Sequence, residues 1–542
     1  MASVDTAKKR VRHGQDPAPG ELTRILPGSN LHLNMRSAIH AVSTAHTPES
    51  LAGGLRGEPG LILLQSGSCQ AAPARYSFVA ARPCQTFRSR GSHCTLEGSG
   101  PAVELFGDPW RILENLLLRY ELPHDLDVPF PLGGCFGYWG YDLRTFVEPK
   151  LPRRCRNDLG LPDCQVGFYP SLVVFDNALG ACHIIATGLT ADGSRTQDQA
   201  QAQLDFWQAA LCRPPGDAPH HTGDIATERT HPSRETNTPP DQASNESALV
   251  HSSMSRAGFV TAVRRAKDYI QAGDIYQVNL SHRLQGPWNG SGWALFERLS
   301  AFSPAPFAGF LQGDRFSVVS ASPEQFLKFS GRHVQTRPIK GTRPRSADPT
   351  RDAQLSYELQ TSTKELAELV MITDLLRNDL GKVCEYGSVQ TPELARLERY
   401  THVHHLVSTV EGRLRPEISH LSALASCFPG GSITGAPKFR AMEIIDELEP
   451  VSRGAYTGAL GYIGFNHESQ LSIVIRTAVT HNGQAYFHAG AGIVADSDPE
   501  AEYQETLAKA RGFLECLGTD PAHSPEVLPQ TSLNITALEG VE

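Results

Sequence analysis

The stretch LSIVIRTAVTHNGQAYFHAGAGIVADSDPEAEYQETLAKARGFL, residues 471–514, decides the fold class. Residues 471–480 and 484–494 are apolar runs rich in β-branched and aromatic residues, and we predict a strand for each. A helix should follow, because Asp498 is suited to the N-cap position and Pro499 to the first helical turn. Paired strands followed directly by a helix favour an α+β protein.

The same mixture extends through the rest of the C-terminal half. RFSVVSASPEQFLKFS, residues 315–330, predicts two further strands. SRAGFVTAVRRAKDYIQAG, residues 255–273, has helical spacing of apolar residues, with Ser255 at its start and Gly273 at its end. We therefore expect an irregular α+β arrangement and not a regular β-α-β alternation.

The N-terminal half alternates short apolar runs with turns. LILLQSGS (61–68) and SLVVFDN (171–177) predict strands, and PWRILENLLLRYEL (109–122) predicts a helix. GGCFGYWGYD (133–142) is so rich in glycine and aromatic residues that we expect a tightly folded turn where backbones approach closely. This half therefore also mixes helices and strands.

A polar segment separates the two halves. Its Pro, Thr, Ser and Asp content is too high, and its apolar content too low, to bury a core. The predicted organisation is a flexible N-terminus (1–24), an N-terminal domain (25–212), a disordered linker (213–254), a catalytic domain (255–520) and a flexible tail (521–542).

Composition excludes several classes of protein. The chain has 542 residues and a net charge of -9 that is spread along the sequence, so we expect no nucleic-acid surface. No apolar run approaches the roughly 18 residues of a membrane helix, and no hydrophobic stretch follows the basic N-terminus. Eleven cysteines without a C-x-x-C pair indicate reduced thiols. We expect a cytoplasmic protein.

Two predicted helices each place carboxylates on one face. In STKELAELVMITDLLRNDLG (362–381), Ser362 is a candidate cap, and Glu365 and Glu368 are three residues apart. In the second helix, Glu502 and Glu505 are also three apart, and Lys509 lies on the same face. Together the four carboxylates are suited to Mg²⁺, which takes one or two of them and fills its other positions with water and substrate oxygens. The alternative is that these are solvated glutamates on the surface.

Other segments are suited to binding an anion. FPGGSITGAPKFRAMEIIDELEP (428–450) leads a Gly/Ser/Thr loop into a helix N-terminus, with Ser432, Thr434 and Lys438 as further donors. HAGAGIV (488–494) is expected to form a second glycine turn that offers backbone amides. Arg476, a charge within an apolar strand, requires a partner. These residues indicate a small polyanion, such as a dicarboxylate.

One lysine stands out in TRPIKGTRPR, residues 336–345. Lys340 follows a Pro-Ile pair and precedes Gly341, which favours a fixed backbone at this point. The alternative is a solvated lysine in a strand-turn.

These stretches together closely resemble the chorismate-utilising enzymes, the family of anthranilate synthase component I, aminodeoxychorismate synthase component I, and the isochorismate and salicylate synthases. The matching segments are GDIYQVNLS (273–281), SPAPFAGFL (303–311), ASPEQF (321–326), PIKGTRPR (338–345), KELAELVMITDLLRNDLG (364–381), YTHVHHLVSTVEG (400–412), FPGGSITGAPK (428–438), IRTAV (475–479) and AGAGIVADSDPEAEYQET (489–506). They follow the family's order through the C-terminal half, and LLQS (63–66) with GGCFGYWGYD resembles its N-terminal domain more weakly.

The resemblance implies two stacked β-sheets in a sandwich surrounded by helices, with chorismate in a deep cleft beside Mg²⁺. Lys340 and Glu324 match catalytic positions. Glu368 and Glu505 match the metal ligands, and Glu365 and Glu502 match helpers that act through water. The residues that match substrate-binding positions are Gln277, Gly341, Thr342, His405, Thr434, Gly435, Tyr456, Arg476, Gly490, Ala491, Gly492 and Lys509.

Lys340 separates the branches of the family. The anthranilate synthases have alanine at this point of the motif, whereas PIKGT resembles the aminodeoxychorismate synthases. There the lysine amine attacks C2 of chorismate as the 4-hydroxyl leaves, and ammonia then attacks C4. The amine is neutral near pH 7 only if its pKa lies far below the usual value of about 10.4. The site must then disfavour the charged form by roughly 4–5 kcal/mol. Glu324 must hold its proton, so burial should raise its pKa.

Gln277 distinguishes a third branch. Isochorismate and salicylate synthases carry a lysine there as the base that activates water, and glutamine cannot do this. The resemblance therefore implies ammonia as the nucleophile. None of the cysteines lies in a G-x-C-x-G-H-Q type of motif, so a separate glutamine amidotransferase subunit is expected to supply it.

The resemblance also implies a tryptophan pocket lined by Ser66, Pro306, Phe307 and Ala308, although Gln65 replaces the acid usual in the anthranilate branch. The expected function is aminodeoxychorismate synthase activity for p-aminobenzoate and folate synthesis. The alternatives are anthranilate synthase component I and a catalytically idle homologue that binds chorismate or tryptophan.

Overall fold

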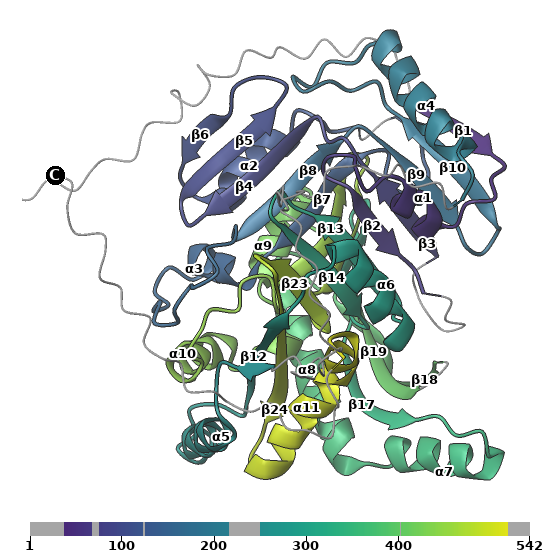
Figure 1. Cartoon of the computed structure of the whole chain (residues 1–542). Coiled ribbons are helices and arrows are strands. Elements are labelled where there is room, and N and C mark those ends of the chain that lie inside the picture. Colours follow the sequence, from purple (N-terminus) through teal and green to yellow (C-terminus); the bar gives the residue numbers. More distant parts are fainter. Residues whose placement is uncertain (1–36, 68–74, 123–124, 216–249, 401–402, 519–542) are drawn as a thin grey trace, which may run out of the picture.

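The computed structural model describes residues 37–67, 75–122, 125–215, 250–400 and 403–518. The predicted flexible ends, 1–24 and 521–542, and most of the predicted linker lie outside this part of the chain. Within it, two large sheets stack with helices around them (Figure 1). The expected α+β sandwich is confirmed.

The first sheet contains twelve strands. Its order is β1 (Ala38–Val42), β10 (Ala181–Ala186), β9 (Ser171–Asp176), β3 (Tyr76–Ala80), β2 (Ile62–Gln65), β13 (Phe307–Gln312), β14 (Phe316–Ser322), β23 (Thr477–His481), β24 (Gln484–Ile493), β12 (Gln277–Pro287) and β11 (His251–Ser252), with β20 (Gly435–Ala436) paired to β12.

The second sheet also contains twelve strands. Its order is β17 (Ile339–Pro344), β19 (Val403–Arg413), β16 (His333–Arg337), β15 (Gln325–Ser330), β22 (Glu468–Ile473), β21 (Ala459–Gly464), β7 (Gly134–Trp139), β8 (Cys164–Tyr169), β4 (Gln85–Arg90), β5 (His93–Gly98) and β6 (Val103–Phe106), with β18 (Gln390–Arg399) paired to β19. Each sheet therefore contains strands from both sides of the polar segment.

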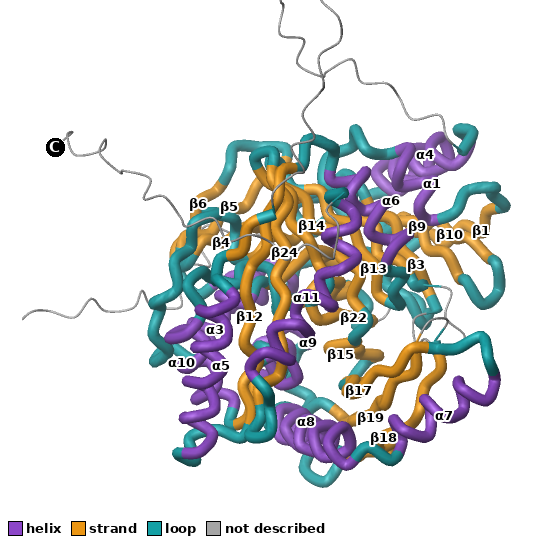
Figure 2. Tube along the Cα trace, turned by 60° about the horizontal axis from the view of Figure 1, so that its bottom comes forward, coloured by secondary structure: helices purple, strands orange, loops and turns teal. Residues whose placement is uncertain are grey.

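The α-helices of the described chain lie around the sheets (Figures 1 and 2). They are α1 (Pro48–Gly54), α2 (Pro109–Leu117), α3 (Arg144–Val147), α4 (Gln197–Cys212), α5 (Arg256–Gln271), α6 (Gly292–Phe302), α7 (Pro349–Gln360), α8 (Thr363–Gly381), α9 (His420–Cys427), α10 (Lys438–Leu448) and α11 (Pro499–Cys516). None of these helices is long and apolar enough to cross a membrane.

The predicted helix starts are confirmed by their caps. Ser255 Oγ accepts a hydrogen bond from Gly258 N at 2.9 Å, and Ser362 caps α8 in the same way. Asp498 caps α11 through the amides of the first turn. Each cap satisfies a backbone amide that the helix itself leaves unpaired. Helix α2 is shorter than predicted, since it ends at Leu117 and not at residue 122.

The prediction of a turn over residues 133–142 is wrong. Residues 134–139 form β7, which lies between β21 and β8 and is buried along its whole length. Glycine is required at position 137, because a Cβ there would lie 2.1 Å from the carbonyl oxygen of Gln165. The expected close approach of backbones is real, but it occurs between strands of a sheet.

Two further predictions for residues 471–494 are corrected. Residues 471–480 form no single strand: β22 belongs to the second sheet and β23 to the first, and Arg476 lies in the step between them with φ of +52°. Residues 488–493 form no turn, because they belong to β24 and pair with β12, Gly490 opposite Ser281. The chain thus changes sheet at Arg476.

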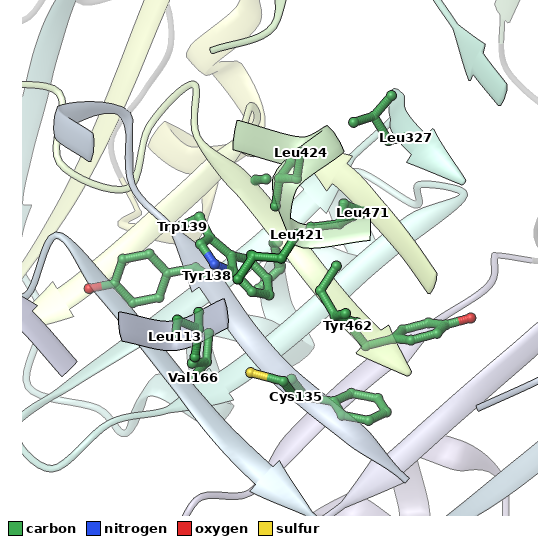
Figure 3. Close-up of a cluster of buried hydrophobic side chains, with 14 of the residues drawn as sticks. Leu113, Cys135, Tyr138, Trp139, Val166, Leu327, Leu421, Leu424, Tyr462 and Leu471 are labelled. Atoms are coloured by element: carbon green, nitrogen blue, oxygen red, sulfur yellow. The ribbon is translucent and has the colours of Figure 1, made fainter. Parts of the chain in front are cut away.

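The core of the second sheet is filled by aromatic and aliphatic side chains from both halves of the chain. Figure 3 shows Tyr138 and Trp139 of β7 among Leu421 and Leu424 of α9 and Leu471 of β22. Trp139 is fully buried. Burying a side chain of this size contributes on the order of 3 kcal/mol, so this cluster holds the central strands of the sheet in place. In contrast, Val370 of α8 is 49% exposed.

Candidate active site

A cleft of about 490 Å³ is lined by residues of α8, α11, β17 and β24, elements whose labels lie close together in Figure 1. Most of the predicted site residues line it. They are Glu324, Lys340, Gly341, Thr342, Glu365, Glu368, His405, Tyr456, Arg476, Gly490, Gly492, Glu502, Glu505 and Lys509. The predicted residues Gln277, Thr434, Gly435 and Ala491 are not among the side chains that line the cleft.

Lys340 enters the cleft from β17. Its ammonium Nζ lies 3.9 Å from Glu368 Oε2, and its side chain is only 17% exposed. The neighbouring Gly341 has φ of +72° and interrupts the register of β17 on β19. A Cβ at Gly341 would lie 2.7 Å from Leu359 Cδ1, so the bulge depends on glycine. The alternative of a freely solvated lysine does not describe this side chain.

The four carboxylates face the cleft from two helices. Burial raises the pKa of Glu368 on α8 and of Glu502 on α11. Burial also acts to raise the pKa of Glu505, but Lys509, whose Nζ lies 2.7 Å from Glu505 Oε1, outweighs it and leaves that pKa lowered. Glu365 Oε1 lies 3.4 Å from Arg343 Nη1. The four glutamates therefore belong to one charged site and not to two separate solvated surfaces.

This set of carboxylates is suited to a magnesium ion that shares its coordination with substrate. Among the described residues, no three His, Cys, Asp or Glu side chains are grouped closely enough to hold a metal ion by themselves. Mg²⁺ does not need such a cage, since it commonly binds one or two carboxylates and several waters or substrate oxygens. Glu368 and Glu505 fit that donor set.

Glu324 is a buried carboxyl at the wall of the cleft. It is 7% exposed, and burial raises its pKa to about 7, against the opposing effects of a hydrogen bond with Ser432 and the charge of Lys340. This side chain therefore carries a proton for much of the time near neutral pH, as a general acid must.

Cationic and hydroxyl side chains also line the cleft. Arg476 lines the cleft at the step between the two sheets, and burial lowers its pKa. Lys509 Nζ donates to the carbonyl oxygen of Gly490 at 2.9 Å. Tyr456 lies over Gly490, where an added Cβ would be 2.9 Å from its hydroxyl. These donors can bind a carboxylate in a site partly shielded from water.

Two predicted donors have structural roles. Lys438 Nζ bonds Asp379 Oδ2 at 2.6 Å and the Cys427 carbonyl oxygen at 2.9 Å, so its prediction as an anion donor is wrong. Thr434 is fully buried and donates to the Gly430 carbonyl oxygen. Gln277 is also fully buried, and both polar atoms of its amide lack a partner among the described residues.

Sequence reasoning missed several residues of the cleft. Arg343, Lys364, Asn279 and His488 all line it. Arg343 and Lys364 stand next to the predicted site residues Thr342 and Glu365 in the sequence, so their place in these motifs already indicated the site. The place of His488 in the site is visible only in the fold. Its ring stacks on that of Tyr456, a residue from another element, with centroids 4.9 Å apart.

The predicted tryptophan pocket is a real but small cavity. Ser66, Pro306, Phe307 and Ala308 line it with Gln65, and its volume is about 40 Å³. Gln65 Nε2 donates to Glu49 Oε1. The space suits a few waters and not an indole ring, so tryptophan binding stays a prediction.

The stacked sheets and the charged cleft define an α+β protein with a site whose donors are suited to a small polyanion. Comparison with known families makes this specific. The family described as chorismate binding enzyme matches residues 69–515. The chain belongs to this family and is a chorismate-utilising enzyme.

Individual relatives fall into two branches. Anthranilate synthase component 1 of Thermus thermophilus is 41% identical over 82% of this chain and 89% of its own. Aminodeoxychorismate synthase component 1 of Klebsiella aerogenes is 38% identical over 85% of this chain and 95% of its own. The crystal structure of anthranilate synthase component I from Streptococcus pneumoniae matches with a TM-score of 0.68 and 30% identity, covering 82% of this chain and 92% of that one.

Proposed function

We propose that the chain is aminodeoxychorismate synthase component I, which converts chorismate and ammonia to 4-amino-4-deoxychorismate for p-aminobenzoate and folate synthesis. One observation carries this choice: Lys340, a side chain with a nucleophilic amine, lies in the cleft with its Nζ 3.9 Å from Glu368 Oε2. The identities to the two branches are too similar to decide between them.

In the proposed reaction, Arg476 and Tyr456 hold the pyruvyl carboxylate of chorismate. The neutral amine of Lys340 attacks C2, the ring double bonds shift, and the bond from C4 to its hydroxyl breaks. Glu324 donates its proton to that oxygen, which leaves as water. Ammonia then attacks C4, the double bonds shift back, and the bond from C2 to Lys340 breaks. Covalent catalysis of this kind divides one difficult substitution into two easier steps.

Mg²⁺ is part of the proposal. Glu368 and Glu505 would hold it directly, and Glu365 and Glu502 through water. Bound there, the ion would neutralise charge on the ring carboxylate of chorismate. Without the ion, the pairs Lys340–Glu368 and Lys509–Glu505 neutralise part of the negative charge of these carboxylates.

A separate amidotransferase subunit is proposed as the source of ammonia. The name "component 1" of the relatives in both branches supports a partner. Ammonium salts should replace it at high concentration.

The test is product identification with purified protein, chorismate, Mg²⁺ and an ammonium salt, with and without an added aminodeoxychorismate lyase. We expect 4-amino-4-deoxychorismate without the lyase, p-aminobenzoate with it, and no turnover after chelation of the metal. Anthranilate as the main product without lyase would instead assign anthranilate synthase, the function favoured by the Thermus relative at 41% identity.

A further inference from the structure

The strand that carries Lys340 is weakly held by the sheet. β17 is the edge strand of the second sheet and, among the described strands, pairs with β19 alone. Its pairing is interrupted between Lys340 and Thr342, at the Gly341 bulge. An edge strand with a bulge has fewer ladder hydrogen bonds to fix it. A precise position for Lys340 therefore requires a further anchor.

Asp352 provides such an anchor for the end of β17. Its Oδ1 accepts hydrogen bonds from Arg345 Nε at 2.9 Å and from the Ser346 amide at 3.0 Å, directly after β17. The same oxygen lies 2.9 Å from His404 Nε2 on β19. One carboxylate oxygen thus joins α7, the end of the lysine strand and the strand that pairs with it.

The cluster of Asp352, Arg345 and His404 continues into the site. His404 is fully buried and lies opposite Arg343 in the register of β17 on β19. The next residue, His405, has its Nδ1 3.0 Å from Thr342 Oγ1 and lines the cleft. A shift of Asp352 would therefore move both strands beside Lys340.

We propose that Asp352 is a positioning residue that fixes the Lys340 strand through Arg345 and His404. The side chain does not line the cleft, so it acts on the reaction only through β17 and β19. Reaction rates depend steeply on such placement, since an error of about 1 Å can cost about a hundredfold. The catalytic part of this inference rests on the proposed function.

The experiment compares Asp352→Ala and Asp352→Asn with wild type in the ammonia-dependent reaction. For Asp352→Ala we expect kcat for aminodeoxychorismate to fall at least about tenfold, with the chorismate KM within about twofold. The fraction of anthranilate should rise, because direct amination at C2 does not need the lysine. Asp352→Asn keeps the shape of the side chain but loses its charge. Its kcat and its anthranilate fraction should lie between those of wild type and Asp352→Ala.

Asp374→Ala is the matched control, because Asp374 is 75% exposed on α8 and its only ion pair within the described chain is with nearby Arg377. It should resemble wild type. Equal loss of both products in Asp352→Ala would show general damage to the fold and overturn the inference, as would an unchanged kcat and product ratio.

A second readout does not depend on the proposed reaction. The rate of reductive methylation of Lys340, followed by peptide mass spectrometry, should rise at least about threefold in Asp352→Ala as the 17% exposed side chain is released. Lys328 on β15, which does not line the cleft, serves as the internal reference. An unchanged ratio of Lys340 to Lys328 labelling would reject the positioning role. Failure of wild type to form aminodeoxychorismate would reject only the proposed function.

Discussion

Strands β7 and β17 belong to the same sheet but differ in pairing, burial and charge. β7 is paired on both sides, buried along its length, and uncharged. β17 is paired on one side, partly exposed, and carries Lys340 and Arg343. The comparison shows that the molecule places Lys340 on an edge strand, at the rim of the sheet, where fewer ladder hydrogen bonds constrain the backbone. The interior strand supplies stability, and the rim strand needs separate anchors.

The largest expected effect tests the rim strand. Lys340→Ala should slow aminodeoxychorismate formation by about a thousandfold or more, because the covalent step loses its nucleophile. The thermal midpoint should change little, since few packing contacts are lost at a sheet edge. Steady-state kinetics and a melting curve measure the two effects. Lys328→Ala on β15 is the control, and full activity of Lys340→Ala would refute the covalent role.

The next effect tests the interior strand. Gly137→Ala should lower the free energy of unfolding by about 3 kcal/mol or more, because its Cβ would lie 2.1 Å from the Gln165 carbonyl oxygen. Denaturant unfolding measures this change. Gly54→Ala, at a position with no atom within 4 Å of the new Cβ, should change stability by less than about 1 kcal/mol. Equal stability of the two variants would contradict the assigned packing of β7.

The smallest effect concerns pH. The folded pKa of Glu324 is raised to about 7, so its protonated fraction falls as pH rises through this value. At constant free ammonia, the ratio of wild-type to Glu324→Gln kcat/KM should therefore fall about tenfold per pH unit above this value. Any other ionisation, such as that of the nucleophile, acts on both enzymes alike and cancels in this ratio. A ratio that stays constant to pH 9 would argue against Glu324 as the acid.

The part of this fold that local chemistry determines could be predicted. Helix starts at Ser255, Ser362 and Asp498 depend on a side chain bonding amides two or three residues away, so the sequence contains the whole interaction. The carboxylates on α8 and α11 follow from helical spacing in the same way. Their approach to each other across the cleft required the fold.

The errors arise where distant residues decide the local structure. β7 looks like a turn because the glycine at position 137 is explained only by β8 and by Gly461, its partner on β21. Arg476 looks like a charge within a strand because nothing local marks the change of sheet. Lys438 looks like a free donor because its partner, Asp379, is 59 residues away.

The pairing of β2 with β13 and of β7 with β21 joins residues before the polar segment to residues after it. A polypeptide cut within that segment would leave two fragments, each with unpaired edges in the middle of both sheets. Neither fragment would retain a closed core, and each would tend to aggregate when expressed alone. Produced together, they carry matching edges and should reassemble by complementation.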